Sequence, residues 1–126
     1  MIALNLNSEI PIYTQLRNQI VEALARGEVA PGEPLPTVRQ LAEDLGINPM
    51  TVNKAYGELK HQGYLETNLK KGTLVKQREA ADPDFLKKIE PRLRLLIAEA
   101  VLHGIPRADF LAAAEQIYSQ FSEVAL

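Results

Sequence analysis

The sequence predicts a mainly α-helical chain with one small β-hairpin, ordered as three helices, the hairpin and two more helices. Apolar residues recur at spacings of three and four along most of the chain, which is typical of helices with one buried face. Prolines and glycines separate these runs, and two short β-branched stretches flank a glycine-containing loop near residue 70. The 126 residues divide into a domain of residues 1–78 and a tail of residues 79–126.

The first two predicted helices have clear start and stop residues. Pro11–Arg26 begins with proline and ends before Gly27, and its predicted buried face comprises Tyr13, Leu16, Ile20 and Leu24. Three prolines between residues 31 and 36 exclude a helix and predict a fixed loop. Thr37–Gln40 matches a capping box, Ser/Thr-x-x-Glu/Gln, that begins a short helix ending at Leu45.

A third helix follows almost at once. Gly46 can end the second helix in a left-handed conformation, while Asn48 caps a new helix with Pro49 in its first turn. This helix runs to about Gln62. Two helices joined by the three residues 46–48 must cross steeply, because so short a link cannot fold them back antiparallel. The pattern predicts a helix-turn-helix.

A β-hairpin is predicted directly after this motif. Its strands are Tyr64–Thr67 and Thr73–Lys76, and the loop Asn68–Gly72 between them has hairpin length. A two-stranded hairpin is only marginally stable alone, so we expect it to pack on the neighbouring helices. In that position it is a wing, and residues 1–78 become a winged helix-turn-helix domain.

The tail begins as a linker and then contains two amphipathic helices. The first runs from Asp82 to near Gly104 with a kink or break at Pro91, and the second begins at Pro106. So short a segment, without cysteine, cannot bury both apolar faces well by itself. We expect it to pair two chains into a homodimer rather than fold back on its own winged domain. The residues expected at this interface are Leu86, Ile89, Leu93, Leu96, Ile97, Val101, Phe110, Ala114, Ile117 and Phe121.

The charge balance differs between the two parts. The chain carries 14 Lys and Arg against 16 Asp and Glu, a net charge of −2, which taken alone argues against a nucleic-acid partner. Residues 1–78 contain nine basic and eight acidic residues, whereas residues 79–126 contain five and eight. The acidity therefore belongs to the tail, and the first domain is compatible with DNA binding.

The helix-turn-helix indicates how DNA would be bound. The second helix of such a motif lies in the major groove, where Asn can pair with adenine, Thr and Met can contact a thymine methyl, and Lys can bind guanine or phosphate. Basic residues on the preceding helix and at the wing tip can meet the phosphate backbone. The candidate DNA-binding residues are Thr37, Arg39, Asn48, Met50, Thr51, Asn53, Lys54, Lys70, Lys71, Gly72 and Thr73.

Seven short segments follow one another along the first domain: Pro11–Leu16, Gly27–Glu33, Leu35–Ala42, Leu45–Ile47, Thr51–Val52, Ala55–Tyr56 and Gly72–Val75. Together they resemble the DNA-binding domain of the GntR family of bacterial transcription regulators, and the turn at residues 47–52 resembles its YtrA-like subfamily. The resemblance implies a winged-helix repressor that binds an operator with two-fold symmetry as a homodimer, and it suggests a neighbouring transport operon as the target.

Residue by residue, the resemblance places Arg39, Thr51 and the wing tip Lys70–Gly72 where the family contacts DNA. Two positions depart from the family pattern. Many members carry arginine where this chain has Pro49 and Asn53, so reading of guanine by arginine is not implied. The wing usually reads Gly-x-Gly, and here Lys70 replaces the first glycine, which leaves the conformation of the wing tip open.

Two functions stay open from the sequence. One is a sequence-specific transcription regulator in the cytoplasm, and the other is a winged-helix protein-interaction module without specific DNA binding. We expect no enzyme, because the sequence contains no Ser/His/Asp or Cys/His constellation and no phosphate loop. We also expect no cofactor, metal or membrane segment, because cysteine is absent and no apolar run approaches about 18 residues. The operator, any effector and the direction of regulation are left open.

Overall fold

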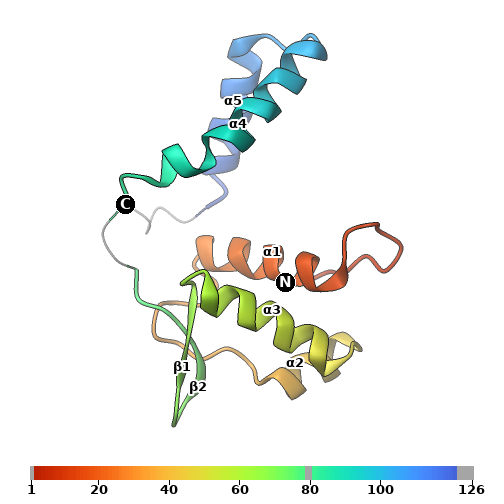
Figure 1. Ribbon diagram of the computed structural model, residues 1–126, viewed down its shortest axis with the longest axis vertical. Helices are drawn as coiled ribbons and strands as arrows, with labels where there is room; N and C mark the ends of the chain where they lie inside the picture. The colour runs from red at the N-terminus through yellow and green to blue at the C-terminus, as the bar shows by residue number, and fades with distance from the viewer. Residues whose placement is uncertain (1, 79–80, 122–126) are drawn as a thin grey trace. The chain divides into compact units, whose positions relative to one another are not determined.

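The computed structural model describes residues 2–78 and 81–121, which form two separate units (Figure 1). The mainly helical fold with one antiparallel hairpin is confirmed. The first unit contains α1 (Ile12–Ala25), α2 (Val38–Leu45), α3 (Pro49–His61), β1 (Leu65–Asn68) and β2 (Gly72–Val75). The second unit contains α4 (Phe85–Leu102) and α5 (Arg107–Tyr118).

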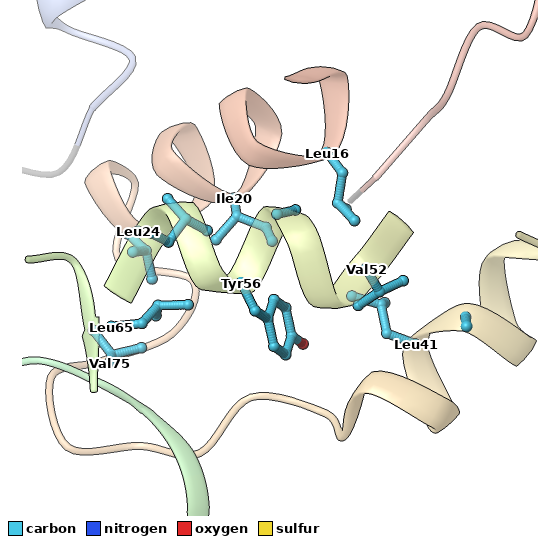
Figure 2. Packing of buried hydrophobic residues seen from close by; sticks show 11 residues of the cluster. Leu16, Ile20, Leu24, Leu41, Val52, Tyr56, Leu65 and Val75 are labelled. Atoms are coloured by element: carbon cyan, nitrogen blue, oxygen red, sulfur yellow. The ribbon is translucent and has the colours of Figure 1, made fainter. Parts of the chain in front are cut away.

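Helix α3 lies at the centre of the first unit and packs against α1, α2 and β1. Figure 2 shows the leucine and isoleucine side chains of α1 directed towards α3. Val52, Ala55 and Leu59 of α3 have no exposed surface. A helix that is buried along one side has a fixed orientation, so its other side can present side chains in defined positions. The core cluster comprises Leu16, Ile20, Leu24, Leu41, Ala42, Val52, Ala55, Tyr56, Leu59, Leu65 and Val75.

The predicted helix caps of the helix-turn-helix are confirmed. The Thr37 hydroxyl oxygen accepts a hydrogen bond from the backbone N–H of Gln40 at 3.1 Å, and Asn48 Oδ1 accepts one from Met50 at 2.8 Å. Gly46 adopts φ 68°, a left-handed conformation that L-residues with a side chain enter at a cost of about 1–2 kcal/mol. These three residues explain why α2 stops and α3 starts within three positions.

The wing is confirmed, with strands shifted by one residue from the prediction. Leu65 pairs with Val75 and Asn68 pairs with Gly72. Asn68 Oδ1 accepts hydrogen bonds from the backbone N–H groups of both Lys70 and Lys71, each at 2.9 Å. Because the asparagine side chain satisfies these turn amides, the strands continue up to a loop of only residues 69–71.

The proline-rich loop after α1 also pairs with the wing, which we did not predict. Gly32 N–H donates to the carbonyl oxygen of Val75 at 2.8 Å, and Leu35 N–H donates to that of Thr73 at 2.8 Å. Pro34 forms an isolated antiparallel bridge with Leu74. Strand β2 therefore has backbone partners on both edges, which stabilises a hairpin that would be marginal with two strands.

The segment before α1 lies along that helix, held by two glutamines one turn apart. Gln19 exchanges hydrogen bonds with the backbone N–H and C=O of Ala3, both at 2.7 Å, and Gln15 does the same with Asn5 at 2.8 and 2.9 Å. Ile2 and Leu4 alternate with these residues and pack against the core. A side-chain amide carries the same donor and acceptor as a peptide group, so α1 here substitutes for a neighbouring strand.

The second unit corrects one expectation. We predicted a kink or a break at Pro91, and of these two the break is wrong, because helix α4 runs across Pro91 as one helix. Proline removes a single N–H donor, and an 18-residue helix keeps the remaining hydrogen bonds on either side of it. Neither α4 nor α5 contains a buried residue. The apolar faces predicted from the sequence are therefore uncovered in the single chain.

Tyr56 ties α3 to the proline-rich loop and makes stability depend on pH. The side chain is 2% exposed, and its hydroxyl donates to the carbonyl oxygen of Pro36 at 2.8 Å. Burial raises the pKa of Tyr56 to about 12 from an ordinary value of 10.0. The folded chain thus holds the phenol proton to higher pH than the unfolded chain, so this contribution is complete below pH 10 and is lost as the pH rises towards 12.

We expect the free energy of unfolding to fall by about 2–3 kcal/mol between these two pH values because of Tyr56. Urea unfolding at stepwise pH measures this change. Tyr56→Phe keeps the buried ring and removes the titrating group. The free energy of unfolding of this variant should therefore not show the decrease that is due to Tyr56. Identical pH profiles for the two proteins would contradict the prediction.

Candidate nucleic-acid interface

The exposed side of α3 near its N-terminus brings most of the predicted base-reading residues together. Met50 is 78% exposed, Asn53 and Lys54 are exposed, and Thr51 is half-buried. These four side chains line one shallow hollow of about 450 Å³. The side chains are of the kinds that recognise base edges in a major groove. The structure therefore places them together on one surface of one helix.

Tyr13 of α1 completes this hollow, and sequence reasoning missed it. Its spacing to Leu16 and Ile20 indicated the buried face of α1, but the side chain is only half-buried. The Lys54 ammonium lies 3.8 Å from the centroid of the Tyr13 ring. The helical period of α1 contained no signal for this contact, because it depends on how α1 packs against α3.

Two predicted contact residues have a structural role as well. The side-chain oxygens of Thr37 and Asn48 are used in the caps of α2 and α3. They sit at the N-terminal ends of those two helices, where backbone N–H groups can meet an anion. A substitution at either position would change helix stability together with any contact to DNA, so neither residue is suitable for testing the interface.

Of the nine basic residues of the first unit, three have a side-chain hydrogen bond or ion pair within the described part of the chain. Arg26 pairs with Glu22 and Glu28, Arg17 donates to Gln62, and Arg78 donates to the carbonyl oxygen of Leu24 at the end of α1. Over the described ranges 2–78 and 81–121, no ion pair engages the predicted contact residues. The basic residues among these predicted contacts are Arg39, Lys54, Lys70 and Lys71, and all four are exposed. Their charges are therefore available to an external phosphate.

The wing tip tolerates the departure at Lys70. Among the residues that the structure describes, none other than glycine has a positive φ, so Lys70 needs no glycine-like conformation. Gly72 does adopt φ 81°, in the region that favours glycine. Thr73 follows it in β2 and is half-buried. The wing therefore retains the one glycine that its turn requires and gains a second lysine.

Neither a metal centre nor a membrane span is apparent in the described part of the chain. No group of three or more His, Asp or Glu side chains there could hold a metal ion. No helix of the described ranges has the length and apolar character needed to cross a bilayer.

A sequence profile described as "Bacterial regulatory proteins, gntR family" matches residues 12–75, just over half of the chain. The chain belongs to the GntR family. The match ends within the first unit, so it spans α1 to β2. In this family member, the residues that line the hollow and the basic residues Arg39, Lys54, Lys70 and Lys71 lie inside the matched region.

The chain is similar to named regulators over most of its length. It is 36% identical to the HTH-type transcriptional repressor YtrA of Bacillus subtilis (strain 168) over 107 residues, which is 83% of this chain and 82% of YtrA. This likeness confirms the YtrA-like resemblance. The crystal structure of a transcriptional antiterminator from Listeria monocytogenes EGD-e matches with a TM-score of 0.82 and 30% identity, over 93% of this chain and 89% of that one.

A second similar structure contains DNA. It is the DNA-binding domain of AraR in complex with the operator ORE1, with a TM-score of 0.51 and 29% identity. The likeness covers 60% of this chain and 92% of that domain. Relatives of this GntR-family chain are thus named transcription regulators and repressors, and one of them is solved on its operator.

Proposed function

We propose that this GntR-family protein is a sequence-specific transcription repressor that binds a palindromic operator as a homodimer in the cytoplasm. Residues 1–78 bind DNA, and residues 79–126 pair two chains. The observation that carries the proposal is the cluster of Met50, Thr51, Asn53 and Lys54 on the exposed side of a helix that is otherwise locked into the core. The resemblance to YtrA-like regulators is the support for a neighbouring transport operon as the target.

In this proposal, contacts to base edges and contacts to phosphate are made by different residues. Asn53 and Thr51 read base edges from α3, because an amide can make two hydrogen bonds to adenine and a threonine methyl can contact thymine. Arg39 on α2 and the wing lysines 70 and 71 bind phosphate, because they are exposed and have no ion-pair partner among the described residues. This division predicts that losing a phosphate-binding residue lowers the affinity for every DNA sequence, whereas losing a base-reading residue lowers the specificity for one base pair.

Support for the dimer comes from the second unit. The predicted interface side chains of α4 other than Ile89 are exposed in the single chain, with Leu93 at 40%, Ile97 at 42% and Val101 at 66%. Phe110 and Ala114 on α5 are half-buried. An apolar hollow of about 440 Å³ between α4 and α5 is lined by residues of both helices. A second copy of the same helices would cover these surfaces, and two-fold pairing is the commonest arrangement for such a contact.

Binding-site selection from random DNA with the purified protein tests the proposal. A recovered palindrome with half-sites about one helical turn, or roughly 34 Å, apart is expected, because two recognition helices related by two-fold symmetry read both halves. Failure to bind any DNA at about 50 mM salt would favour a protein-interaction module instead.

Substitutions test the division of labour between the contact residues. Arg39→Ala and Lys71→Ala should each weaken binding to every sequence and reduce the slope of log affinity against log salt by about 0.9. Thr51→Ala and Asn53→Ala should leave that slope unchanged and lose about 1–3 kcal/mol of discrimination at one base pair. Salt titrations on the selected operator and on single-base variants measure both effects.

A matched control is Lys87→Ala, which removes an exposed lysine from α4 of the second unit. It should change neither the slope nor the base preference. Equal losses across all operator variants for all four interface substitutions would show that the assignment of base-reading and phosphate-binding residues is wrong.

A further inference from the structure

We infer that Tyr13 is a positioning residue for Lys54, so that the DNA-reading surface includes the start of α1 as well as α3 and the wing. The inference rests on the proposed function and deepens it. Tyr13 lies in the first turn of α1 (Ile12–Ala25), far before Lys54 in the sequence, and helix packing alone brings the two together.

The geometry is that of a cation–π contact. The Lys54 ammonium is 3.8 Å from the centroid of the Tyr13 ring, well within the distance of about 6 Å at which the negative face of an aromatic ring attracts a cation. Both side chains line the same hollow as Met50, Thr51 and Asn53. The ring therefore places the lysine charge beside the side chains proposed to read bases.

Holding the lysine has a consequence for binding. A free lysine side chain has many rotamers, and fixing it on DNA costs conformational entropy. A ring that already restrains the ammonium lowers this cost. An ammonium has three N–H donors, so a ring on one side of it leaves donors for a phosphate or a guanine. Tyr13 thus preorganises Lys54 without consuming its charge.

The surroundings of Tyr13 argue that its ring, and not its hydroxyl, makes the contribution. Across residues 2–78 and 81–121, the Tyr13 hydroxyl has no hydrogen-bond partner. The ring is also outside the buried cluster, in which Leu16, Ile20 and Leu24 represent α1. Phenylalanine should therefore replace tyrosine at this position, whereas leucine should remove the effect while keeping an apolar side chain there.

The test is a double-mutant cycle in the full chain, with affinity for the selected operator measured by fluorescence anisotropy. Tyr13→Leu should weaken binding about twofold to fivefold, the range expected for an exposed cation–π contact. Tyr13→Phe should bind like the wild type. In the Lys54→Gln background, Tyr13→Leu should have no further effect, because no cation remains to be positioned.

A matched control is Tyr64→Leu, which removes the ring beneath Arg17, whose guanidinium lies 5.8 Å from the centroid of that ring. Any effect of this change on operator affinity should be the same in the wild-type background and in the Lys54→Gln background. Thermal unfolding of every variant separates a loss of fold from a loss of contact, and the coupling between positions 13 and 54 should be seen at temperatures where all variants are folded.

Three results would overturn the inference. They are the same loss of operator affinity from Tyr13→Leu in the wild-type and Lys54→Gln backgrounds, a loss from Tyr13→Phe as large as that from Tyr13→Leu, or tighter binding by Tyr13→Leu. The first would assign Tyr13 a structural role, and the last would show that the ring withholds Lys54 from DNA. A wild-type protein that binds no DNA would overturn the proposed function together with this inference. Binding by the wild type with an additive cycle would overturn the inference alone.

Discussion

Ile97→Glu is expected to convert the proposed dimer into a monomer and to weaken binding to the proposed palindromic operator by about a hundredfold or more. The side chain is 42% exposed in the single chain and lies on the apolar face of α4, so a dimer would place a glutamate in an apolar interface. A carboxylate buried there without a partner is strongly destabilising. Loss of the dimer also removes the gain from binding two linked half-sites, which reaches about 10²–10⁴.

Sedimentation and operator titration of the same samples measure the two effects together. Leu93→Glu and Phe110→Glu should behave like Ile97→Glu, because they lie on the predicted interface faces of α4 and α5. The matched control is Leu95→Glu, the same chemical change on the opposite side of α4, where the leucine is 64% exposed. An unchanged dimer in all three interface variants would show that α4 and α5 do not pair the chains.

Leu59→Ala is expected to lower the free energy of unfolding of the first unit by about 2–5 kcal/mol. Leu59 is on α3 and has no exposed surface, so truncation removes apolar contacts and leaves a cavity in the cluster that fixes the recognition helix. For a domain with a total stability of about 5–15 kcal/mol, this is a large fraction. DNA binding should fall with stability, since a loosened α3 no longer presents its side chains in defined positions.

Chemical denaturation followed by circular dichroism measures this change. Leu69→Ala is the matched control, because Leu69 is at the wing tip and its side chain is fully exposed. It should change stability by less than about 0.5 kcal/mol. A similar loss from both substitutions would show that burial in the cluster around α3 does not determine the stability of this unit.

Helix boundaries in this chain were predictable because they depend on neighbouring residues. Thr37 and Asn48 accept hydrogen bonds from N–H groups two or three positions along, and Gly46 adopts a left-handed φ at the end of α2. These contacts are local, so sequence spacing carries the information. For the same reason the caps identified the helix-turn-helix, and with it the exposed residues of the candidate interface.

Pairings between distant segments were not predictable in this way. Nothing local to Gln15 and Gln19 indicates that they hold the backbone of Ala3 and Asn5, and nothing in the proline-rich loop indicates that it adds to β2. Pro91 was interpreted by its usual effect on a helix, yet α4 continues across it. In each case the local structure depends on which hydrogen-bonding groups and surfaces other parts of the chain bring close, and residue type alone does not determine it.

By itself, the sequence determined the order of the elements, the ends of α1, α2 and α3 to within one residue, the apolar faces of α4 and α5, and the family, because each depends on residue spacing along the chain. The start of α4 was predicted at Asp82 and lies at Phe85. Only the tertiary structure decided which charged groups are available. Arg17, Arg26 and Arg78 have partners within the chain, whereas Arg39 has no ion pair among the described residues and Lys54 lies against Tyr13. A lysine or arginine has the same charge wherever it stands in the sequence. Packing of the chain determines whether a carboxylate, a carbonyl oxygen or an aromatic ring lies within a few ångströms of that charge.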